Sequence, residues 1–313
     1  MGNIVTSGVL GFVVGDALGL AYQDKSREEM KNIQVVMGKY ENREKGSWSD
    51  DTSTMLCTME GLTGGLDYNN IAKALHKWLK EGYLTPGGEA FSVGRTTNGA
   101  LSMYKDGIDP TSLGLKDERS LGNGSLMRML PLAYYLYAKN YDQEKTIEII
   151  KNVSSITHGH SVAIVGCIIY TLFAMSLIEG NTMWNAYIDL KDKINTLREN
   201  NEYRDEIELY SRIIDNNIIM YDESEIKSTG YCVDTLEAVF WSFLNGDGYN
   251  DCVNKGIKLG CDTDTIGALT GALAGIYYGE EDIEVDLVEN IILKDKIISV
   301  SDKFFDYLIE STN

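Results

Sequence analysis

GVLGFVVGDALGLAY (Gly8–Tyr22) and IGALTGALAGIYY (Ile266–Tyr278) are the two stretches that decide the fold, because both are apolar and carry glycine at every fourth position. The repeated glycines are Gly11, Gly15 and Gly19 near the start of the chain, and Gly267, Gly271, Gly275 and Gly279 near its end. A glycine inside a helix costs about 1 kcal/mol relative to alanine, so this many need a structural reason. A stripe of glycines lets a second helix approach closely. We therefore predict two helices packed tightly at the centre of the protein.

Apolar residues recur at helical spacing over most of the remaining chain, and strictly alternating runs are scarce. This spacing predicts helices over residues 71–79, 207–218 and 233–243, and the longest loops are expected at residues 85–88 and 104–123. The chain has only three prolines, which suits long helices joined by loops rich in glycine and asparagine. No repeat of fixed period and no Pro-, Gly- or Ser-rich linker is evident. We predict an all-α fold in which residues 1–313 form a single compact domain.

The chain is strongly acidic, since 47 Asp and Glu residues against 28 Lys and Arg residues give a formal net charge of -19. This charge repels nucleic-acid backbones and anionic lipid headgroups, so neither is an expected partner. The five cysteines are scattered, odd in number and never spaced as C-x-x-C, which argues against disulfides and thiolate zinc sites. No secretory signal opens the chain. We expect a cytoplasmic protein.

Two acidic clusters stand directly before predicted helices: Ser49-Asp50-Asp51-Thr52 and Asp262-Thr263-Asp264-Thr265. Helix capping explains each cluster taken singly, because these side chains accept hydrogen bonds from free backbone N–H groups. A cap needs only one such residue, however, and each cluster supplies two carboxylates with flanking hydroxyls.

The charge of the clusters distinguishes helix capping from cation binding. Two carboxylates about 4 Å apart repel by roughly 4 kcal/mol at an effective dielectric near 20, and a helix N-terminus offers only about half a positive charge against this. If the clusters meet, their four aspartates suit two divalent cations. The donors are hard oxygen atoms, which favour magnesium or manganese over zinc, with calcium also possible. Spacing alone does not establish that residues some two hundred positions apart touch.

Six segments in a fixed order bear on that contact. They are Gly15–Gly19, Trp48–Thr52, Gly122–Arg128 with Pro131, Thr157-His158, Gly230–Leu236, and Gly260–Thr265 leading into Gly267 and Gly271. Together they resemble the ADP-ribosylglycohydrolase family, which includes the dinitrogenase reductase-activating glycohydrolases, over about residues 5–280.

The resemblance implies an all-α orthogonal bundle with two Mg²⁺ or Mn²⁺ ions in a central cleft. The implied metal ligands are Ser49, Asp50, Asp51, Asp262, Asp264 and Thr265. Asp51 and Asp264 are the implied catalytic residues, nearest to a water beside the anomeric carbon of the distal ribose. The substrate is expected to be ADP-ribose on a modified protein.

The remaining matches are expected to be substrate contacts. These residues are Thr97, Ser120, Leu121, Gly122, Asn123, Gly124, Ser125, His158 and Tyr231. Backbone N–H groups of the loop 120–125 are expected to hold the diphosphate at the start of the following helix, although an ordinary Asn-Gly turn is the alternative. His158 is expected to face the diphosphate or a ribose, and Tyr231 to stack on adenine. For Arg128 both a phosphate contact and a buried ion pair stay open.

Two departures from the family pattern affect the substrate. Gln23 stands where many members carry a glutamate that is taken as catalytic in the branch cleaving serine-linked ADP-ribose. Glutamine is no base, and losing a general base typically costs about 10²–10⁴-fold in rate, so arginine-linked substrates are favoured; Asp24 is a possible replacement base. Cys261 replaces the usual glycine beside the metal site. Two other functions remain open: an ADP-ribose-binding protein with little catalysis, and a two-metal nucleotide or phosphoester hydrolase.

Overall fold

The computed structural model describes residues 4–199 and 203–311, and within these residues it contains α- and 3₁₀-helices and no strand. The longer helices are α1 (Ile4–Leu20), α3 (Asp50–Leu62), α4 (Tyr68–Glu81), α5 (Arg95–Ser102), α6 (Leu130–Lys139), α7 (Gln143–Ser154), α8 (Ser161–Ile178), α9 (Met183–Glu199), α12 (Cys232–Leu244), α13 (Tyr249–Lys258), α14 (Thr263–Tyr278) and α16 (Lys294–Glu310). Short helices are α2 (Arg27–Met30), α10 (Arg204–Leu209), α11 (Ser211–Ile214) and α15 (Val285–Glu289). The predicted all-α fold is confirmed.

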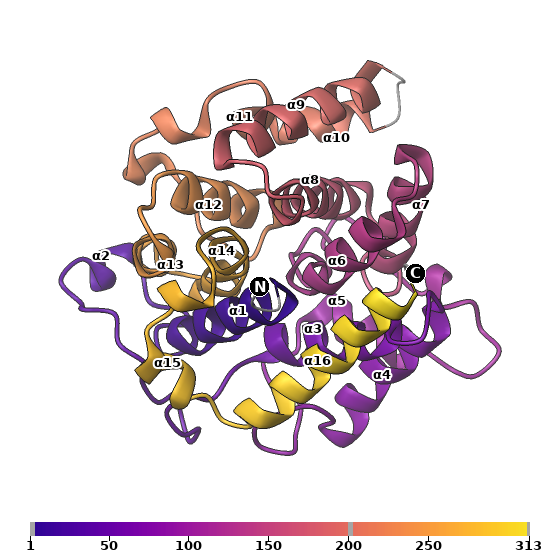
Figure 1. Ribbon diagram of the computed structural model, residues 1–313, viewed down its shortest axis with the longest axis horizontal. Helices are drawn as coiled ribbons and strands as arrows, with labels where there is room; N and C mark the ends of the chain where they lie inside the picture. The colour runs from indigo at the N-terminus through magenta and orange to yellow at the C-terminus, as the bar shows by residue number, and fades with distance from the viewer. Residues whose placement is uncertain (1–3, 200–202, 312–313) are drawn as a thin grey trace.

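Helices α1 and α14 form the tightest helix pair at the centre of the protein (Figure 1). A Cβ atom on Gly15 would lie 2.1 Å from the carbonyl oxygen of Gly267, and one on Gly11 would lie 2.3 Å from that of Gly271. The pairing runs antiparallel, because Gly19 at the end of α1 meets Thr263 at the start of α14. The predicted close packing is confirmed, and it carries the end of α1 to the start of α14.

Gly279 is an exception to the predicted stripe. It follows the last residue of α14 and has φ 88°, in the left-handed region where glycine avoids a steric penalty. Its role is therefore to end the helix and not to pack against α1.

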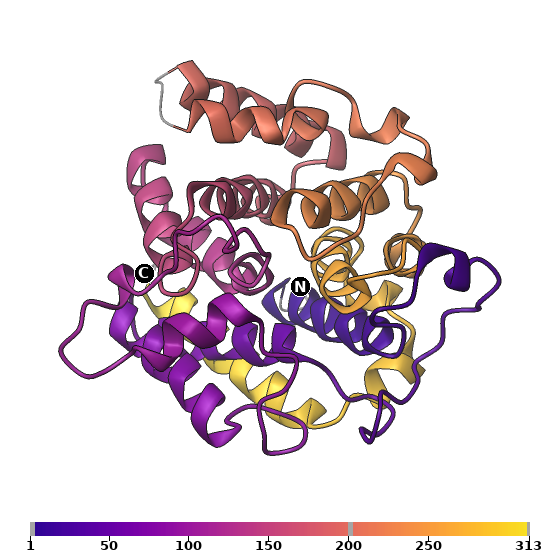
Figure 2. The same ribbon diagram turned by 180° about the vertical axis from the view of Figure 1, so that it is seen from behind.

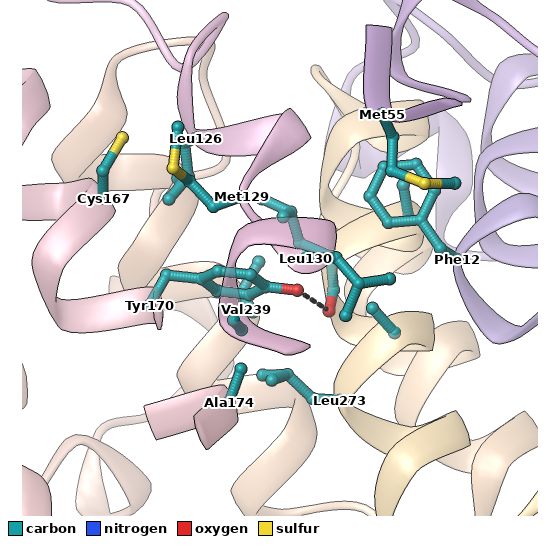
Figure 3. Packing of buried hydrophobic residues seen from close by; sticks show 14 of the residues in the cluster. Phe12, Met55, Leu126, Met129, Leu130, Cys167, Tyr170, Ala174, Val239 and Leu273 are labelled. Carbon is teal, nitrogen blue, oxygen red and sulfur yellow. Dashed lines mark hydrogen bonds between the residues drawn. The ribbon is translucent and has the colours of Figure 1, made fainter. Parts of the chain in front are cut away.

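The hydrophobic core surrounds this pair. Figure 3 shows Phe12 of α1, Met55 of α3 and Leu130 of α6 pointing toward one another, with Tyr170 of α8 and Leu273 of α14 beside them. The Tyr170 hydroxyl donates to the carbonyl oxygen of Leu269 at 3.4 Å. Helix α8 is long and apolar enough to cross a membrane, but 89% of it is buried in the protein, as in many core helices.

The other helices lie on two sides of this core. Helices α9, α10 and α11 form an outer layer beyond α8 and α12, whereas α3, α4 and α16 lie on the opposite side of α1 (Figures 1 and 2). The outer layer corrects one prediction, because residues 207–218 form no single helix. The chain leaves helical geometry at Tyr210 (φ −96°, ψ 14°), whose buried hydroxyl donates to the Val162 carbonyl oxygen of α8 at 2.8 Å.

Two of the predicted helices are confirmed, since residues 71–79 lie in α4 and residues 233–243 in α12. The loop 104–123 is one of the longest connections, interrupted only by a 3₁₀ turn at Pro110–Ser112. A second long connection, residues 31–49 between α2 and α3, was not predicted, and its last residue begins the candidate site.

Candidate metal centre and cleft

The candidate site lies where α1 ends and where α3 and α14 begin. Asp16 of α1 fixes the start of α3: its carboxylate accepts hydrogen bonds from the backbone N–H of Ser49 (3.0 Å) and from the backbone N–H (3.0 Å) and hydroxyl (2.6 Å) of Thr52. The side chain of Ser49 accepts from the N–H of Asp51 and so caps α3. The capping interpretation therefore holds for Ser49, and it places two aspartates side by side at a helix start.

The two acidic clusters meet in space. The Thr265 hydroxyl lies 3.3 Å from Asp51 Oδ2 and 3.3 Å from Asp262 Oδ1, and the Ser49 hydroxyl donates to Asp51 Oδ2 at 2.7 Å. One carboxylate oxygen from each of Asp16, Asp51 and Asp264 lies within 4.8 Å of the other two. The clusters that the sequence separates by some two hundred residues therefore form one group.

Capping does not explain the second cluster. Asp262 occupies the position before α14 but makes no side-chain capping bond among the described residues. Its Oδ2 instead accepts from Asn123 Nδ2 at 2.5 Å, and Asn123 also donates to Thr235 at 2.9 Å. Asp262 is therefore oriented toward the cleft by a loop from another part of the chain.

Burial and mutual repulsion make this cluster electrostatically unfavourable without a cation. Burial, followed by the charges of neighbouring aspartates, raises the pKa of Asp50, Asp51 and Asp264 well above its usual value. Burial also raises the pKa of Asp262, and raises that of Asp16 to about 6. Like charges in a low-dielectric site favour proton uptake unless positive charge is supplied.

The residues present fit a divalent cation. Asp51 Oδ1 is buried and has no hydrogen-bond partner among the described residues, which leaves a lone pair free for a metal. The donors around it are carboxylate and hydroxyl oxygens, the set that magnesium and manganese prefer. Asp16 is the weakest of the three clustered carboxylates as a ligand, because its oxygens already accept bonds from the start of α3.

A cleft of about 390 Å³ opens beside the acidic cluster. The predicted residues that line it are Asp50, Asp51, Thr97, Gly122, Asn123, Gly124, His158, Asp262, Asp264 and Thr265. The predicted residues outside this lining are Ser49, Ser120, Leu121, Ser125 and Tyr231. Ser120 bonds to Asp117, and Ser125 is buried against Ser154, so these two hydroxyls stabilise the loop and do not line the cleft.

The middle of the loop 120–125 is bound to residues 230–232, which positions its glycines. Gly122 forms an isolated bridge with Tyr231, and the Asn123 N–H donates to the carbonyl oxygen of Gly230 at 3.1 Å. A Cβ on Gly124 would lie 2.8 Å from the His158 ring and 2.9 Å from the Thr97 hydroxyl. Only glycine fits there, so this part of the cleft is lined by backbone.

The two histidines of the H-x-H pair have separate roles. His158 is buried at the cleft, and its Nδ1 lies 2.9 Å from the Thr157 hydroxyl. His160 caps α8 by accepting from the Val162 N–H at 3.2 Å. Arg128 is buried and donates to Thr157 and to the carbonyl oxygen of Val153. Neither of its predicted roles is observed, because it lines no part of the cleft and forms no ion pair among the described residues.

Several cleft residues were not predicted. Tyr40, Arg95 and Arg119 line the cleft, and Arg95 Nη2 donates to the carbonyl oxygen of Arg119 at 2.6 Å. They lie on loops or at a helix start and outside the six segments quoted above. The apolar spacing of the sequence therefore gave no indication that they line a cleft. Asp16 had a usable signal, since a carboxylate inside an apolar glycine-rich helix must find its partners on another element.

Gln23 and Asp24 also line the cleft. In the amide orientation that satisfies both of its polar atoms, Gln23 Nε2 lies 3.0 Å from Asp264 Oδ2. Gln23 therefore acts as a donor to a clustered carboxylate, a contact that an ionised glutamate at this position would replace with repulsion. Asp24 is exposed and has φ 66°.

Cys261 has φ 61°, a left-handed conformation that costs a non-glycine residue about 1–3 kcal/mol. We expect Cys261→Gly to raise the free energy of unfolding by about 1 kcal/mol, because glycine adopts this conformation without the steric penalty. Urea denaturation measures the difference. Cys261→Ala is the matched control, since it removes the thiol but keeps the strained backbone. An equal gain from alanine would contradict the explanation.

The whole chain was compared with known proteins. The ADP-ribosylglycohydrolase family model matches residues 3–312. ADP-ribosylarginine hydrolase Tri1 of Serratia proteamaculans is 27% identical over 303 residues, covering 95% of this chain and 77% of that protein. ADP-ribosyl-[dinitrogen reductase] glycohydrolase of Rhodospirillum rubrum is 26% identical, covering 91% and 89%. A solved ADP-ribosylglycohydrolase-related protein complex has the same fold, with a TM-score of 0.78, 24% identity and 98% coverage of both chains.

Proposed function

Because the chain belongs to the ADP-ribosylglycohydrolase family, we propose that it is a metal-dependent hydrolase that releases ADP-ribose from modified arginine side chains. Hydrolysis of an ADP-ribose linkage is the activity that this membership and the named relatives support. The buried carboxylate cluster of Asp16, Asp51 and Asp264 at the cleft is the observation that supports the proposed metal dependence. We further propose that residues 1–313 act as one domain in the cytoplasm, in line with the match over residues 3–312 and with five free cysteines.

The proposed metal ligands are Ser49, Asp50, Asp51, Asp262, Asp264 and Thr265. Two Mg²⁺ or Mn²⁺ ions bound there would orient the distal ribose and lower the pKa of an attacking water. Asp51 and Asp264 are the proposed acceptors of the proton of that water; both border the cleft, and Asp51 Oδ1 has no partner among the described residues. Gln23, which also lines the cleft, donates a hydrogen bond to Asp264.

Charge gives the substrate an orientation in the cleft. Arg95 and Arg119 line one part, beside the glycine loop and His158, and two guanidinium groups in a chain of net charge -19 suit an anionic diphosphate. Asp24 and Tyr40 line the part beside Asp264. Burial is the largest cause of the raised Tyr40 pKa, and the charges of Glu41, Asp24 and Asp264 also raise it. The diphosphate is therefore proposed to bind at the arginines and the bond to be cleaved to face Asp24.

Three observations favour arginine as the leaving group. Two similar bacterial proteins are named ADP-ribosylarginine hydrolase, so arginine is the modified residue in their named activity. Gln23 can neither accept a proton from the attacking water nor supply one to a departing serine oxygen, as a titratable glutamate could. The carboxylate of Asp24 and the ring of Tyr40 together suit a departing guanidinium, through charge pairing and cation–π contact.

A linkage assay tests this proposal. We expect the purified protein with Mg²⁺ or Mn²⁺ to release ADP-ribose from an arginine-modified protein, to leave the serine-linked substrate nearly intact, and to lose activity with a chelator. Asp24→Asn should raise KM for the arginine-linked substrate about tenfold, since a charged partner is lost, and leave free ADP-ribose binding unchanged. Glu28→Gln, which changes an exposed acid in the neighbouring helix α2, is the control.

Three outcomes would contradict the proposal. Tight ADP-ribose binding without turnover would indicate a binding protein, and AMP or phosphate as product would indicate a phosphoester hydrolase. Equal activity on serine-linked substrate would leave the hydrolase in place and remove the arginine specificity.

A further inference from the structure

We infer that Arg128 and Thr157 are positioning residues that hold His158 in the Nε2–H tautomer, so that its ring presents a hydrogen-bond donor to the cleft. The tautomer is argued from the protein alone. Only the identity of the acceptor, an oxygen of ADP-ribose, rests on the proposed function.

The three side chains form a continuous chain of hydrogen bonds behind the cleft. Arg128 Nη2 lies 2.9 Å from the Thr157 hydroxyl oxygen, and the same oxygen lies 2.9 Å from His158 Nδ1. All three residues are buried, with exposed fractions of 1%, 0% and 2%. Bulk water therefore does not compete for these bonds, and their direction is set by the side chains themselves.

Donor counting fixes that direction. A guanidinium group only donates, so the Thr157 oxygen must accept from Arg128. That oxygen has a second lone pair, but among the described residues the Thr157 hydroxyl hydrogen has no acceptor other than His158 Nδ1, so Nδ1 is unprotonated. In a neutral imidazole the proton is consequently on Nε2. The opposite tautomer would leave the buried hydroxyl hydrogen without an acceptor, which costs free energy.

The Nε2 edge of the ring faces the substrate side. A Cβ on Gly124 would lie 3.2 Å from Nε2 and one on Gly122 would lie 3.9 Å from it, and both glycines line the cleft. Within the described part of the chain, Nε2 has no hydrogen-bond partner and is not sealed off from the cleft. Its donor is therefore available to a bound molecule.

Burial and the same arginine both keep the ring neutral. Burial, followed by the charges of Arg128 and Arg95, lowers the His158 pKa to about 3. Arg128 Nε and Nη1 have no partner among the described residues, so its charge is not cancelled by a nearby carboxylate. His158 thus offers one directed N–H group and no positive charge.

A purely structural role is the alternative for Arg128. Its Nη2 also donates to the carbonyl oxygen of Val153 at 2.9 Å, in the last turn of α7, where a cation interacts favourably with the helix dipole. That role accounts for the folding contribution of Arg128. It does not account for the position of Thr157 between Arg128 and the ring. Substitutions of Thr157 therefore distinguish the positioning role from the structural one.

Nitrogen-15 NMR of the histidine rings reports the tautomer directly, and the chain has only three histidines. We expect His158 in the free protein to be protonated at Nε2 at neutral pH. Thr157→Ser keeps the hydroxyl and should keep this state, whereas Thr157→Val should give a mixture of tautomers with His160 unchanged. Arg128→Met should also give a mixture if it folds. Protonation at Nδ1 in the wild type, or an unchanged Thr157→Val tautomer, would overturn the inference.

Calorimetric titration with ADP-ribose tests the consequence for binding. Thr157→Val should bind about tenfold to a hundredfold more weakly, the effect of losing a hydrogen bond to a charged group, and Thr157→Ser should bind like the wild type. Unchanged binding by Thr157→Val would refute the role in the cleft. If the wild type binds no ADP-ribose, the proposed function fails, while the tautomer measurement still decides the inference.

Discussion

Asp264→Asn should lower kcat/KM for the arginine-linked substrate by about 10²–10⁴-fold, the range for loss of a positioned acid–base group. Asp51→Asn should have an effect of the same order, because both side chains belong to one buried cluster facing the cleft. Divalent cation binding, measured by calorimetry, should weaken in parallel. Full activity and unchanged cation binding in both variants would remove the site assignment.

Asp264→Asn should lower activity without lowering the stability of the metal-free protein. Without metal, burial and repulsion from Asp51 and other acids raise the pKa of Asp264, so a neutral amide relieves an unfavourable interaction. We expect the metal-free Tm of Asp264→Asn to equal or exceed that of the wild type. Asp192→Asn, an exposed change in α9, is the control and should alter neither activity nor Tm. A large fall in the metal-free Tm would show that Asp264 is primarily structural.

Gly15→Ala should produce the largest loss of stability, about 3 kcal/mol, at the upper end of the usual range for overpacking. The new Cβ would lie 2.1 Å from the carbonyl oxygen of Gly267 and 2.6 Å from its carbonyl carbon. Backbone atoms cannot rotate away as a side chain can, so α1 and α14 must separate. Urea denaturation measures the loss, and cation affinity should fall too because Asp16 and Asp264 move with these helices.

Gly99→Ala in α5 is the matched control for this prediction. Its new Cβ would meet only the end of the flexible Leu115 side chain, at 3.0 Å, and alanine favours helix by about 1 kcal/mol over glycine. We expect Gly99→Ala to be neutral or stabilising. Similar losses from both substitutions would mean that helix–helix distance is not what the α1 glycines protect.

The sequence allowed the fold and most of the acidic cluster to be predicted, for physical reasons that differ. Glycine at every fourth position is costly unless a backbone lies against it, so the α1–α14 pair could be inferred before any contact was known. Adjacent aspartates before a helix are likewise too repulsive to be caps alone. Their convergence required the family resemblance, because no local pattern encodes contact between Asp51 and Thr265.

What could not be predicted depends on tertiary contacts. The helix break at Tyr210 follows from its bond to α8, which overrides a continuous apolar spacing. Arg95 comes to the cleft as the first residue of α5 and Arg119 on a loop, and at neither place does periodicity carry information. Arg128 lies in one of the segments shared with the family, which suggested a phosphate contact or a buried ion pair. In the structure it donates to the Thr157 hydroxyl instead.

The pairing of the first long helix with the one at residues 263–278 has a consequence for biosynthesis. At about 5–20 residues per second, a ribosome needs roughly 10–50 s to make the intervening chain. During that time the strongly apolar helix α1 lacks its main native partner, which makes the nascent protein a substrate for chaperones and prone to aggregation. Because the acidic cluster joins Asp16 and Asp51 to Asp264, it cannot form until the chain has been made as far as α14.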